Sequence, residues 1–386
     1  MHSTRTSGAI AAGAIVSLAL AGCATGAAAP GAEGDRLQVV ATTTQIGDFT
    51  REVVGDAADV TQLLQPGQSA HGFDPSPQAL QSLAAADVLV VNGAGLEEWL
   101  DGAVEASGFD GTVIDASTDV HLHEGSGHDH ADEHAHEGEE AHADEAGHAD
   151  EAGHADVTAH AEETAHAEET AHAEEAEHAD EAAAAASDDE HDHGGVDPHI
   201  WSDPHQVEHM VGTIVAGLAE ADAAQAQAFT ANGEAYLGRL EALDTWIHES
   251  VDQVPEDERL LVTTHDTFSY LAEAQGITVV GNVFASLDDN AEPSAAEMDA
   301  LIAAIRDTGV RAVFSETSIN PALAETIARD AGVEVFSGED ALYADSLGAE
   351  GSPGATYIGS QVHNITRIVE SWGAEPVALP AELEEP

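Results

Sequence analysis

A tract rich in histidine and acidic residues, at positions 121–193, most constrains how this chain can fold. It holds 15 of the 23 His and 25 of the acidic residues, lacks Arg, and contains few apolar side chains larger than Ala. Such a segment cannot bury enough apolar surface to offset the entropy lost on ordering. Because the cost of closing a loop grows only logarithmically with its length, a folded domain can carry it. We therefore predict that 121–193 is a disordered insertion.

The histidines of this tract do not follow a helical ligand pattern. Between His142 and His178 they recur every six residues, so in an α-helix successive side chains would lie about 120° apart. No stripe of neighbouring ligands four residues apart would form. Pairs of the form His-x-His can instead chelate a cation from an extended chain, and the surrounding acids attract cations. These pairs lie at 121/123, 128/130, 134/136 and 191/193.

The net charge argues against several classes of protein. The 386 residues include 74 Asp and Glu but only 9 basic residues, all of them Arg, for a formal charge of -65 at pH 7. This charge repels phosphate backbones and anionic lipid headgroups, which argues against nucleic-acid binding. Outside the tract, 49 acids accompany the 9 Arg, and 43% of the chain is hydrophobic. The remainder is therefore foldable, with enough core for two or three domains.

The N-terminus has the features of an export signal. Its apolar stretch at 9–21 is too short to span a membrane as a helix. It ends in Leu-Ala-Gly-Cys, which resembles the lipobox of bacterial lipoproteins, where the cysteine becomes the lipidated first residue. We predict a signal peptide at 1–22, lipidation of Cys23 and a flexible tether at 23–36, with an ordinary secretory signal as the alternative. The protein would then be anchored at the outer face of the cytoplasmic membrane.

Short β-branched runs alternate with helical patterns from residue 37 onward, as is typical of parallel βα units. They predict an α/β fold with two lobes built on parallel sheets. The first lobe spans 37–221 and carries the insertion, and the second spans 255–386. The expected strands lie at 37–43, 60–64, 88–92, 112–115, 260–264, 278–283, 312–315 and 334–336, and the expected helices at 45–54, 77–85, 96–106, 267–275, 295–308 and 321–331.

A single long helix is predicted between the lobes, at 222–254. This stretch contains no Pro, and its apolar residues at 229, 236, 240, 243 and 247 recur at helical spacing. A helix of about 30 residues is roughly 45 Å long. It is long enough to join the two lobes as a spine.

Four residues outside the tract follow predicted strands, where open α/β sheets bind ligands. His71 lies in a loop flanked by Gly and Pro, and His199 in the motif Asp-Pro-His-Ile-Trp. His265 directly follows a strand, and Asp345 lies in the motif Asp-Ser-Leu-Gly. Because Cys23 is the only cysteine, no intramolecular disulfide can form, and metal ligands must be His, Asp or Glu.

In this order the motifs closely resemble those of the metal-binding lipoproteins of zinc and manganese ABC importers. The resemblance covers nearly all of 37–372, and the His-rich insertion before Asp-Pro-His-Ile-Trp matches the zinc members. It implies two α/β lobes joined by one rigid helix, with the metal in the cleft between them. The motifs are His-Gly-Phe-Asp-Pro-Ser-Pro at 71–77, Asp-Pro-His-Ile-Trp at 197–201, His-Asp-Thr-Phe-Ser-Tyr-Leu at 265–271, Asp-Ser-Leu-Gly at 345–348 and Gly-Ala-Thr-Tyr at 354–357.

The resemblance also implies a function and a ligand set. The ligands would be His71 and His199 from the first lobe, and His265 and Asp345 from the second. The protein would be a monomeric receptor, not an enzyme. It would capture Zn²⁺ outside the cytoplasmic membrane and deliver it to a membrane permease driven by a cytoplasmic ATPase.

The ligand types favour zinc as the bound metal. Three neutral imidazoles and one carboxylate suit Zn²⁺ better than the oxygen-preferring Mn²⁺. Manganese-type members resemble this pattern but have Glu where His265 stands. The second-lobe disulfide of some zinc members has no counterpart here, which bears on the rigidity of that lobe rather than on the metal. Because the ligands must be deprotonated, binding should weaken as the pH falls through about 6 to 7, where His titrates.

Other residues near the motifs leave some roles open. Alternatives to Asp345 as the fourth ligand are Asp74, Asp266, Asp340 and Glu316.

Two further pairs have other expected roles. Asp197 or Asp203 could orient a ligand His through its second ring nitrogen. His205 and His209 are four residues apart on a predicted helix and are expected to be a solvated pair.

Competing functions also remain open. These are a manganese-type receptor, a zinc hydrolase with three His ligands and Asp345 as base, and a passive metal buffer or adhesin. For the insertion at 121–193, we favour gathering Zn²⁺ near the cleft over sensing zinc or acting as a solvated spacer.

Overall fold

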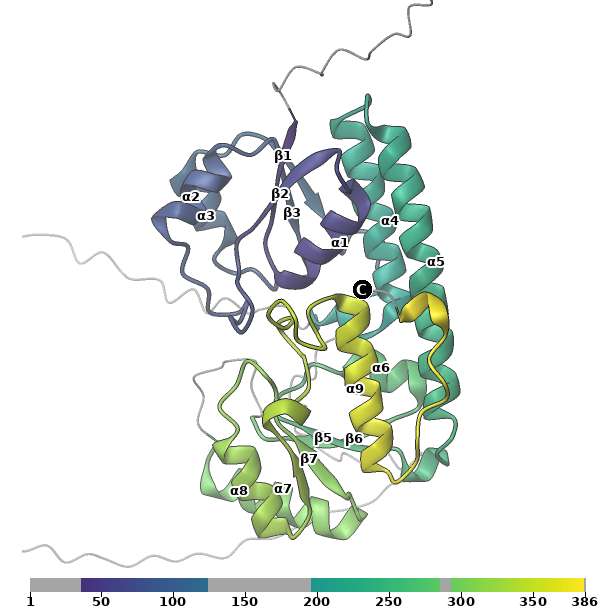
Figure 1. Cartoon of the computed structure of the whole chain (residues 1–386). Helices are drawn as coiled ribbons and strands as arrows, with labels where there is room; N and C mark the ends of the chain where they lie inside the picture. The colour runs from purple at the N-terminus through teal and green to yellow at the C-terminus, as the bar shows by residue number, and fades with distance from the viewer. Residues whose placement is uncertain (1–35, 124–195, 285–292, 385–386) are drawn as a thin grey trace, which may run out of the picture.

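The computed structural model describes residues 36–123, 196–284 and 293–384. The predicted signal peptide, the lipidation site Cys23, nearly all of the tether and most of the insertion lie outside these residues. Figure 1 shows two lobes, one above the other, with long helices along one side. The predicted α/β class with parallel sheets is confirmed.

The first lobe is built on a four-stranded parallel sheet in the order β2-β1-β3-β4. Every residue of β3 is buried, as expected for an inner strand of a parallel sheet. Helix α1 follows Thr43, whose side chain accepts a hydrogen bond from the Ile46 N–H, and α2 begins with Pro77. The elements are β1 (Leu37–Ala41), α1 (Thr44–Val54), β2 (Ala58–Gln62), α2 (Pro77–Ala84), β3 (Val88–Val91), α3 (Leu100–Ser107) and β4 (Thr112–Asp115).

Helix α3 begins four residues later than the predicted start at residue 96. The reason is a buried turn after β3, in which the Glu97 carboxylate accepts hydrogen bonds from the N–H groups of Asn92 and Gly93. The Thr42 hydroxyl also donates to this carboxylate, at 2.6 Å. A side chain that binds back to the preceding backbone delays the helix.

The second lobe contains two parallel units, β5-β6 and β7-β8. They meet where the Thr264 hydroxyl donates to the carbonyl oxygen of Phe314 at 3.3 Å. An isolated parallel bridge between Glu316 and Leu342 extends this edge. The elements are β5 (Leu260–Thr263), α6 (Ser269–Gln275), β6 (Thr278–Asn282), α7 (Ala295–Thr308), β7 (Ala312–Phe314), α8 (Ala322–Ala331) and β8 (Glu334–Phe336).

The predicted spine helix at 222–254 is shorter in the structure, where α5 spans Ala226–Val251. The chain instead breaks at Asp222, which ends α4 (Pro204–Ala221). The Asp222 carboxylate accepts hydrogen bonds from the N–H groups two and three residues later, a local arrangement that competes with the helix.

Helix α5 runs beside α4 along the first lobe and continues past it along the second (Figure 1). There α9 (Tyr357–Ser371), a helix that was not predicted, packs against it. The apolar residues that predicted α5 are all buried: Phe229, Tyr236, Leu240, Leu243 and Ile247.

One hydrophobic cluster crosses the boundary between the lobes. The ring of Phe49 in α1 lies 6.4 Å from that of Tyr236 in α5 and contacts Tyr357 of α9 edge-on at 5.1 Å. A smaller cluster in the second lobe surrounds Ile305 and Ile327. Burial of apolar surface shared by both lobes therefore helps to hold them together.

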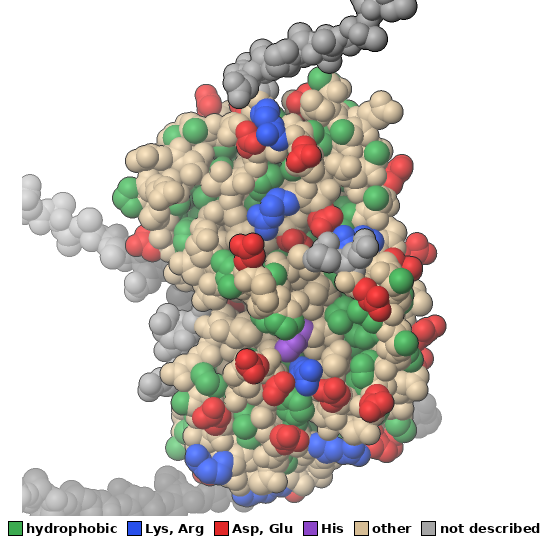
Figure 2. All heavy atoms as spheres, viewed as in Figure 1, with side chains coloured by type: hydrophobic (Ala, Val, Ile, Leu, Met, Phe, Trp, Pro, Cys, Tyr) green, Lys and Arg blue, Asp and Glu red, His purple; other side chains and the backbone are tan. Residues whose placement is uncertain are grey.

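Acidic side chains dominate the charged surface. Figure 2 shows them scattered over one face of both lobes, with arginines among them rather than gathered in one patch. No helix of the described residues is both long enough and apolar enough to cross a bilayer.

A buried carboxylate lies where α1 meets α9. Asp48 is 7% exposed, and its Oδ2 accepts a hydrogen bond from the Tyr357 N–H at 2.9 Å. Burial raises the pKa of Asp48 to about 6, although the backbone bond and nearby Arg51 act to lower it. The charged form is therefore destabilised in the folded state.

We predict that Asp48→Asn stabilises the fold at pH 7.5. Since the folded pKa lies above the unfolded value, the penalty from Asp48 develops as the pH rises from about 4 to 6. An amide oxygen can still accept from the Tyr357 N–H. The free energy of unfolding should rise by about 1–3 kcal/mol at pH 7.5 and change little near pH 4, as measured by urea unfolding. The exposed Asp110→Asn is the matched control; an equal gain at both pH values would contradict the prediction.

Candidate metal site

His71 enters the site from the loop between β2 and α2. The loop is held by the Trp99 indole N–H, which donates to the carbonyl oxygen of Ala70 at 3.0 Å. It also contacts the second lobe, since the Gly67 N–H donates to the Ser346 hydroxyl at 2.8 Å. The His71 side chain remains 14% exposed, so it lies nearest to solvent of the four predicted ligands.

His199 is fully buried just before the 3-10 turn Ile200–Ser202 that leads into α4. Its Nδ1 lies 2.7 Å from Asp197 Oδ1, which also accepts from the His199 N–H at 3.0 Å. A ring that donates from Nδ1 presents the lone pair of Nε2. Of the two acids predicted to orient a ligand His, Asp197 is therefore the one in contact. Asp203 instead caps α4.

His265 lies two residues after the end of β5 and is 2% exposed. Glu316, which lies just after β7, contacts it twice. Glu316 Oε1 accepts from the His265 N–H at 3.0 Å, and Oε2 lies 2.8 Å from Nδ1. Glu316 was an alternative fourth ligand, but here it lies behind the imidazole and orients it.

Asp345 lies in the loop between β8 and α9. Residues of the first lobe hydrogen-bond to this loop on both sides of Asp345. The carbonyl oxygen of Ala344 accepts from Gln45 Nε2 and from the Trp201 indole N–H, each at 3.0 Å. The Leu347 N–H donates to the Thr44 hydroxyl at 2.8 Å. Contacts with residues 143 to 303 positions earlier therefore place this carboxylate.

The four predicted residues converge where the lobes meet. One ligand atom from each of His71, His199, His265 and Asp345 lies within 4.8 Å of the other three. The two closest pairs are both 3.2 Å apart: Nε2 of His71 to Nε2 of His199, and Nε2 of His265 to Asp345 Oδ1. The alternatives Asp74, Asp266 and Asp340 are not part of the group.

The spacing suits a small tetrahedral cation. Metal–ligand bonds of about 2.0–2.1 Å in a tetrahedron place ligand atoms roughly 3.3 Å apart. Asp345 Oδ1 lies 3.7 Å from His199 Nε2, and Oδ2 lies 3.8 Å from His71 Nε2. Asp345 Oδ2 is buried without a hydrogen-bond partner among the described residues. An orphaned buried oxygen facing imidazole nitrogens fits a bound cation.

The site is charged even without metal. Burial opposes protonation of His265, but the carboxylates of Asp345 and Glu316 outweigh it and hold the pKa of His265 well above its usual value. Burial likewise acts to raise the pKa of Asp345, but the imidazoles, led by His265, hold it well below its usual range. Protonated His265 thus supplies a positive charge beside Asp345 in the metal-free protein.

The family of the chain follows from comparison with known proteins. A model of the ZnuA family, described as the periplasmic component A of the zinc-uptake complex, matches residues 39–371. The chain belongs to this family. ZnuA proteins are extracytoplasmic metal-binding receptors of ABC importers and not enzymes. The resemblance inferred from the motifs is therefore confirmed, and the hydrolase alternative is excluded.

The names of individual relatives refer to different metals. The manganese-binding lipoprotein MntA of Halalkalibacterium halodurans is 28% identical over 92% of this chain and 95% of its own length. The iron-binding protein YfeA of Yersinia pestis is 24% identical over 89% of each chain. The periplasmic zinc-binding protein TroA of Treponema pallidum shares the fold, with a TM-score of 0.64 and 20% identity over 88% of this chain and 99% of that one.

Other residues considered from the sequence lie outside the site. His205 and His209 are exposed on α4 with ring centres 5.3 Å apart, as predicted for a solvated pair. No sequence pattern indicated that Thr44 and Gln45 would hydrogen-bond to the Asp345 loop, because both look like ordinary residues at the start of α1.

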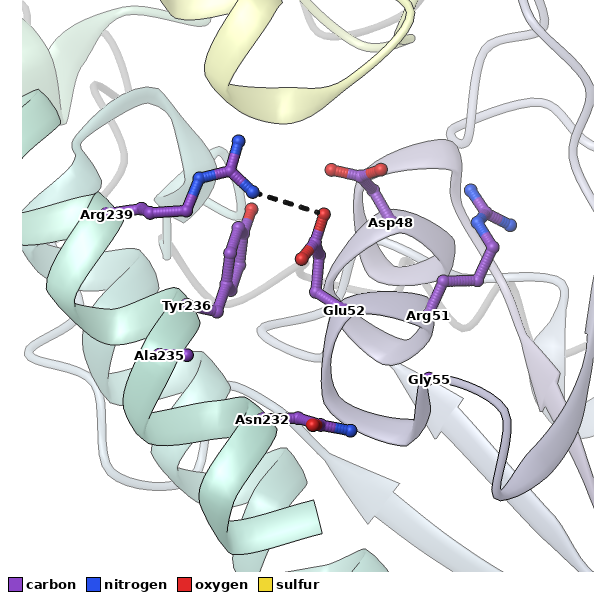
Figure 3. Close-up of a pocket in the computed structure, with 8 residues that line it drawn as sticks. All are labelled: Asp48, Arg51, Glu52, Gly55, Asn232, Ala235, Tyr236 and Arg239. Atoms are coloured by element: carbon purple, nitrogen blue, oxygen red, sulfur yellow. Dashed lines mark ion pairs between the residues drawn. The ribbon is translucent and has the colours of Figure 1, made fainter. Parts of the chain in front are cut away.

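A separate hollow of about 510 Å³ lies between α1 and α5 of this ZnuA-family protein (Figure 3). Arg239 pairs with Glu52 at 3.7 Å, and Arg51 donates to the neutral amide of Gln62 at 3.0 Å. None of the four predicted ligands lines it.

We predict that metal binding releases at least about one proton at pH 7. His265 Nε2 must lose its proton to bind a cation, and its pKa in the metal-free protein is raised. Affinity should therefore fall as the pH drops, starting above the ordinary histidine value of about 6.5. Calorimetry of zinc binding in two buffers of different ionisation enthalpy measures the release.

Glu316→Gln serves as the comparison for proton release. It removes one of the carboxylates that raise the pKa of His265, so fewer protons should be released at pH 8 than from the native protein. A binding enthalpy that is independent of the buffer at pH 7 would contradict the prediction.

Proposed function

We propose that this ZnuA-family receptor captures Zn²⁺ between its lobes through His71, His199, His265 and Asp345. The observation that carries the proposal is the convergence of three imidazoles and one buried carboxylate within 4.8 Å. Imidazole nitrogen is a preferred ligand of Zn²⁺, and four protein ligands fill a tetrahedral site. A filled site suits capture and release rather than activation of water.

A manganese-type receptor is the second candidate. MntA, the relative named for manganese, matches 92% of this chain, and another relative is named for iron. The ligand atoms of the site argue against manganese, because Mn²⁺ favours carboxylate, carbonyl and water oxygens. Only one of the four donors here is an oxygen, and His265 stands where the manganese-type pattern has Glu.

We also propose how the receptor is anchored to the membrane and where its domains begin and end. The signal peptide would be 1–22 and Cys23 the lipidated residue, with 23–36 as tether, so that a monomeric receptor stays on the outer face of the cytoplasmic membrane. The two metal-binding lobes, 37–221 and 255–386, would be joined by the helix within 222–254. From this position it would pass Zn²⁺ to the permease and ATPase subunits of its importer.

The His-rich insertion would gather metal for the cleft. His123, the last described residue at the start of the insertion, has its Nε2 3.3 Å from Glu273 Oε2 of α6. His199 lies soon after the insertion's other end. The His-x-His pairs beyond residue 123 lie outside the described residues. Their weak chelation would raise the local concentration of Zn²⁺.

Single alanine substitutions of the four proposed ligands should each remove tight zinc binding. Each loss should exceed the roughly 10- to 100-fold typical of losing an outer hydrogen-bond partner. Competition between Zn²⁺ and Mn²⁺ on protein lacking residues 124–190 measures both affinity and preference. His209→Ala, an exposed histidine on α4, is the control and should bind as the native protein does. If Mn²⁺ wins the competition, the zinc assignment fails.

Deletion of 124–190 should lower the number of zinc ions bound while one tight site remains. The weak ligands of the insertion and the buried ligands of the cleft belong to separate parts of the chain. Metal analysis after dialysis, with chelator competition, distinguishes the two classes. Loss of the tight site in the deletion protein would refute this division of roles.

A strain that lacks the gene should grow poorly only when zinc is scarce. This growth defect would distinguish an importer component from a passive buffer.

A further inference from the structure

The carboxylate of Asp197 connects the proposed ligand His199 to the second lobe. Its Oδ1 binds the His199 backbone and ring, as described above. Its Oδ2 accepts a hydrogen bond from the hydroxyl of Ser269, the first residue of α6. Asp197 is 7% exposed and His199 fully buried, so both bonds lie in a region of low dielectric, where they are strong.

The next residue of α6, Tyr270, adds a second link. Its hydroxyl donates to the carbonyl oxygen of Asp197 at 2.7 Å and accepts from the His123 N–H at 3.1 Å. Burial raises the pKa of Tyr270 to about 12, so the hydroxyl keeps the proton that it donates. The ring of His123 stacks on Tyr270, with centroids 3.9 Å apart and planes 11° apart.

The two ends of the insertion are also joined to each other at this point. The Asp197 N–H donates to the carbonyl oxygen of His123 at 3.1 Å. Residues that flank the insertion, although carried by the first lobe, therefore meet on α6 of the second.

Glu316 provides an internal comparison. Its Oε2 lies 2.8 Å from His265 Nδ1, as Asp197 Oδ1 lies 2.7 Å from His199 Nδ1. Glu316 and His265 belong to the same lobe, however, whereas Asp197 bonds across the boundary to Ser269. Of these two carboxylates, Asp197 is the one whose contacts depend on how the lobes are placed.

We propose that Asp197 is a positioning residue that couples the orientation of His199 to closure of the lobes and to docking of the two flanks of the insertion, at 123 and 197, on α6. The inference rests on the proposed function, because it takes His199 as a zinc ligand. When α6 moves away with the second lobe, Asp197 loses its partners there, and His199 loses the fixed acceptor that aims its Nε2. Release of metal and undocking of these two flanks then occur together.

The test removes the contacts between lobes and keeps the contact with His199. Ser269→Ala deletes the donor to Asp197 Oδ2. Asp197→Asn retains an oxygen for His199 Nδ1 and removes the charged acceptor of the Ser269 hydroxyl, leaving at most a weaker neutral bond from the amide N–H to that hydroxyl. In the full mature chain, both variants should still bind zinc at the tight site. The slow phase of zinc dissociation, measured by stopped flow with excess chelator, should accelerate by about 5- to 150-fold, the range of typical coupling energies.

Hydrogen exchange supplies a second measurement, one that a change in local packing around Ser269 would not alter. In the native protein, zinc should protect the amides of 120–123 and 196–199 together with those of α6. In Ser269→Ala combined with Tyr270→Phe, zinc should no longer protect the two flanks of the insertion. Thermal unfolding checks that each variant is folded.

Two matched variants control for the substitutions themselves. Ser269→Thr keeps the hydroxyl and should restore the native dissociation rate. Ser371→Ala removes a hydroxyl that donates within α9, away from the site, and should leave the rate unchanged. A threonine variant as fast as the alanine variant would overturn the proposal, because packing rather than the hydrogen bond would then explain the effect.

The outcomes separate this inference from the proposed function. If His199→Ala binds zinc as tightly as the native protein, both fail. If His199→Ala loses tight binding while Ser269→Ala and Asp197→Asn release zinc and exchange amides as the native protein does, the coupling alone is overturned.

Discussion

The structure depends most on the burial of one carboxylate, that of Asp345, among imidazoles from both lobes. Removing a carboxylate from water is costly unless other charges or hydrogen bonds compensate. Here the nearest imidazole nitrogens lie 3.2 to 3.8 Å away, and one carboxylate oxygen has no hydrogen-bond partner among the described residues. The charge is thus stabilised when the lobes are together, and a divalent cation would stabilise it further. Closure and metal capture therefore share one electrostatic cause.

The groups around the site fix the geometry that this charge requires. Asp197 and Glu316 each lie against the Nδ1 of a histidine whose Nε2 faces Asp345, and the loop of Asp345 is gripped by residues of α1. Rings held in this way lose little freedom when a metal binds. The shared apolar cluster around Phe49 and Tyr357 keeps the lobes in contact. The contacts that hold the ligand side chains in place before a metal binds therefore come from both lobes.

Local sequence patterns predicted most of the helices and strands. Where the prediction differs from the structure, the cause is either a local hydrogen bond or a distant contact. The strands at 112–115 and 334–336 and the helix at 295–308 were predicted at their observed bounds. The spine was predicted too long because the Asp222 carboxylate bonds to the backbone that follows it. Helix α9 was not predicted, and its apolar face is buried against distant elements, α5 and α1. Periodicity detects an apolar face but not the surface that will cover it.

The sequence by itself determined the α/β class and the four residues in ordered motifs after strands. These follow from composition and short-range spacing, which one stretch of chain carries alone. Only the tertiary structure decided that Glu316 lies behind His265, that Asp197 rather than Asp203 contacts His199, and that both flanks of the insertion meet on α6. Apart from Asp197 and His199, which are two positions apart, these contacts join residues tens to hundreds of positions apart. No local pattern encodes which of several similar carboxylates will be brought to a given nitrogen.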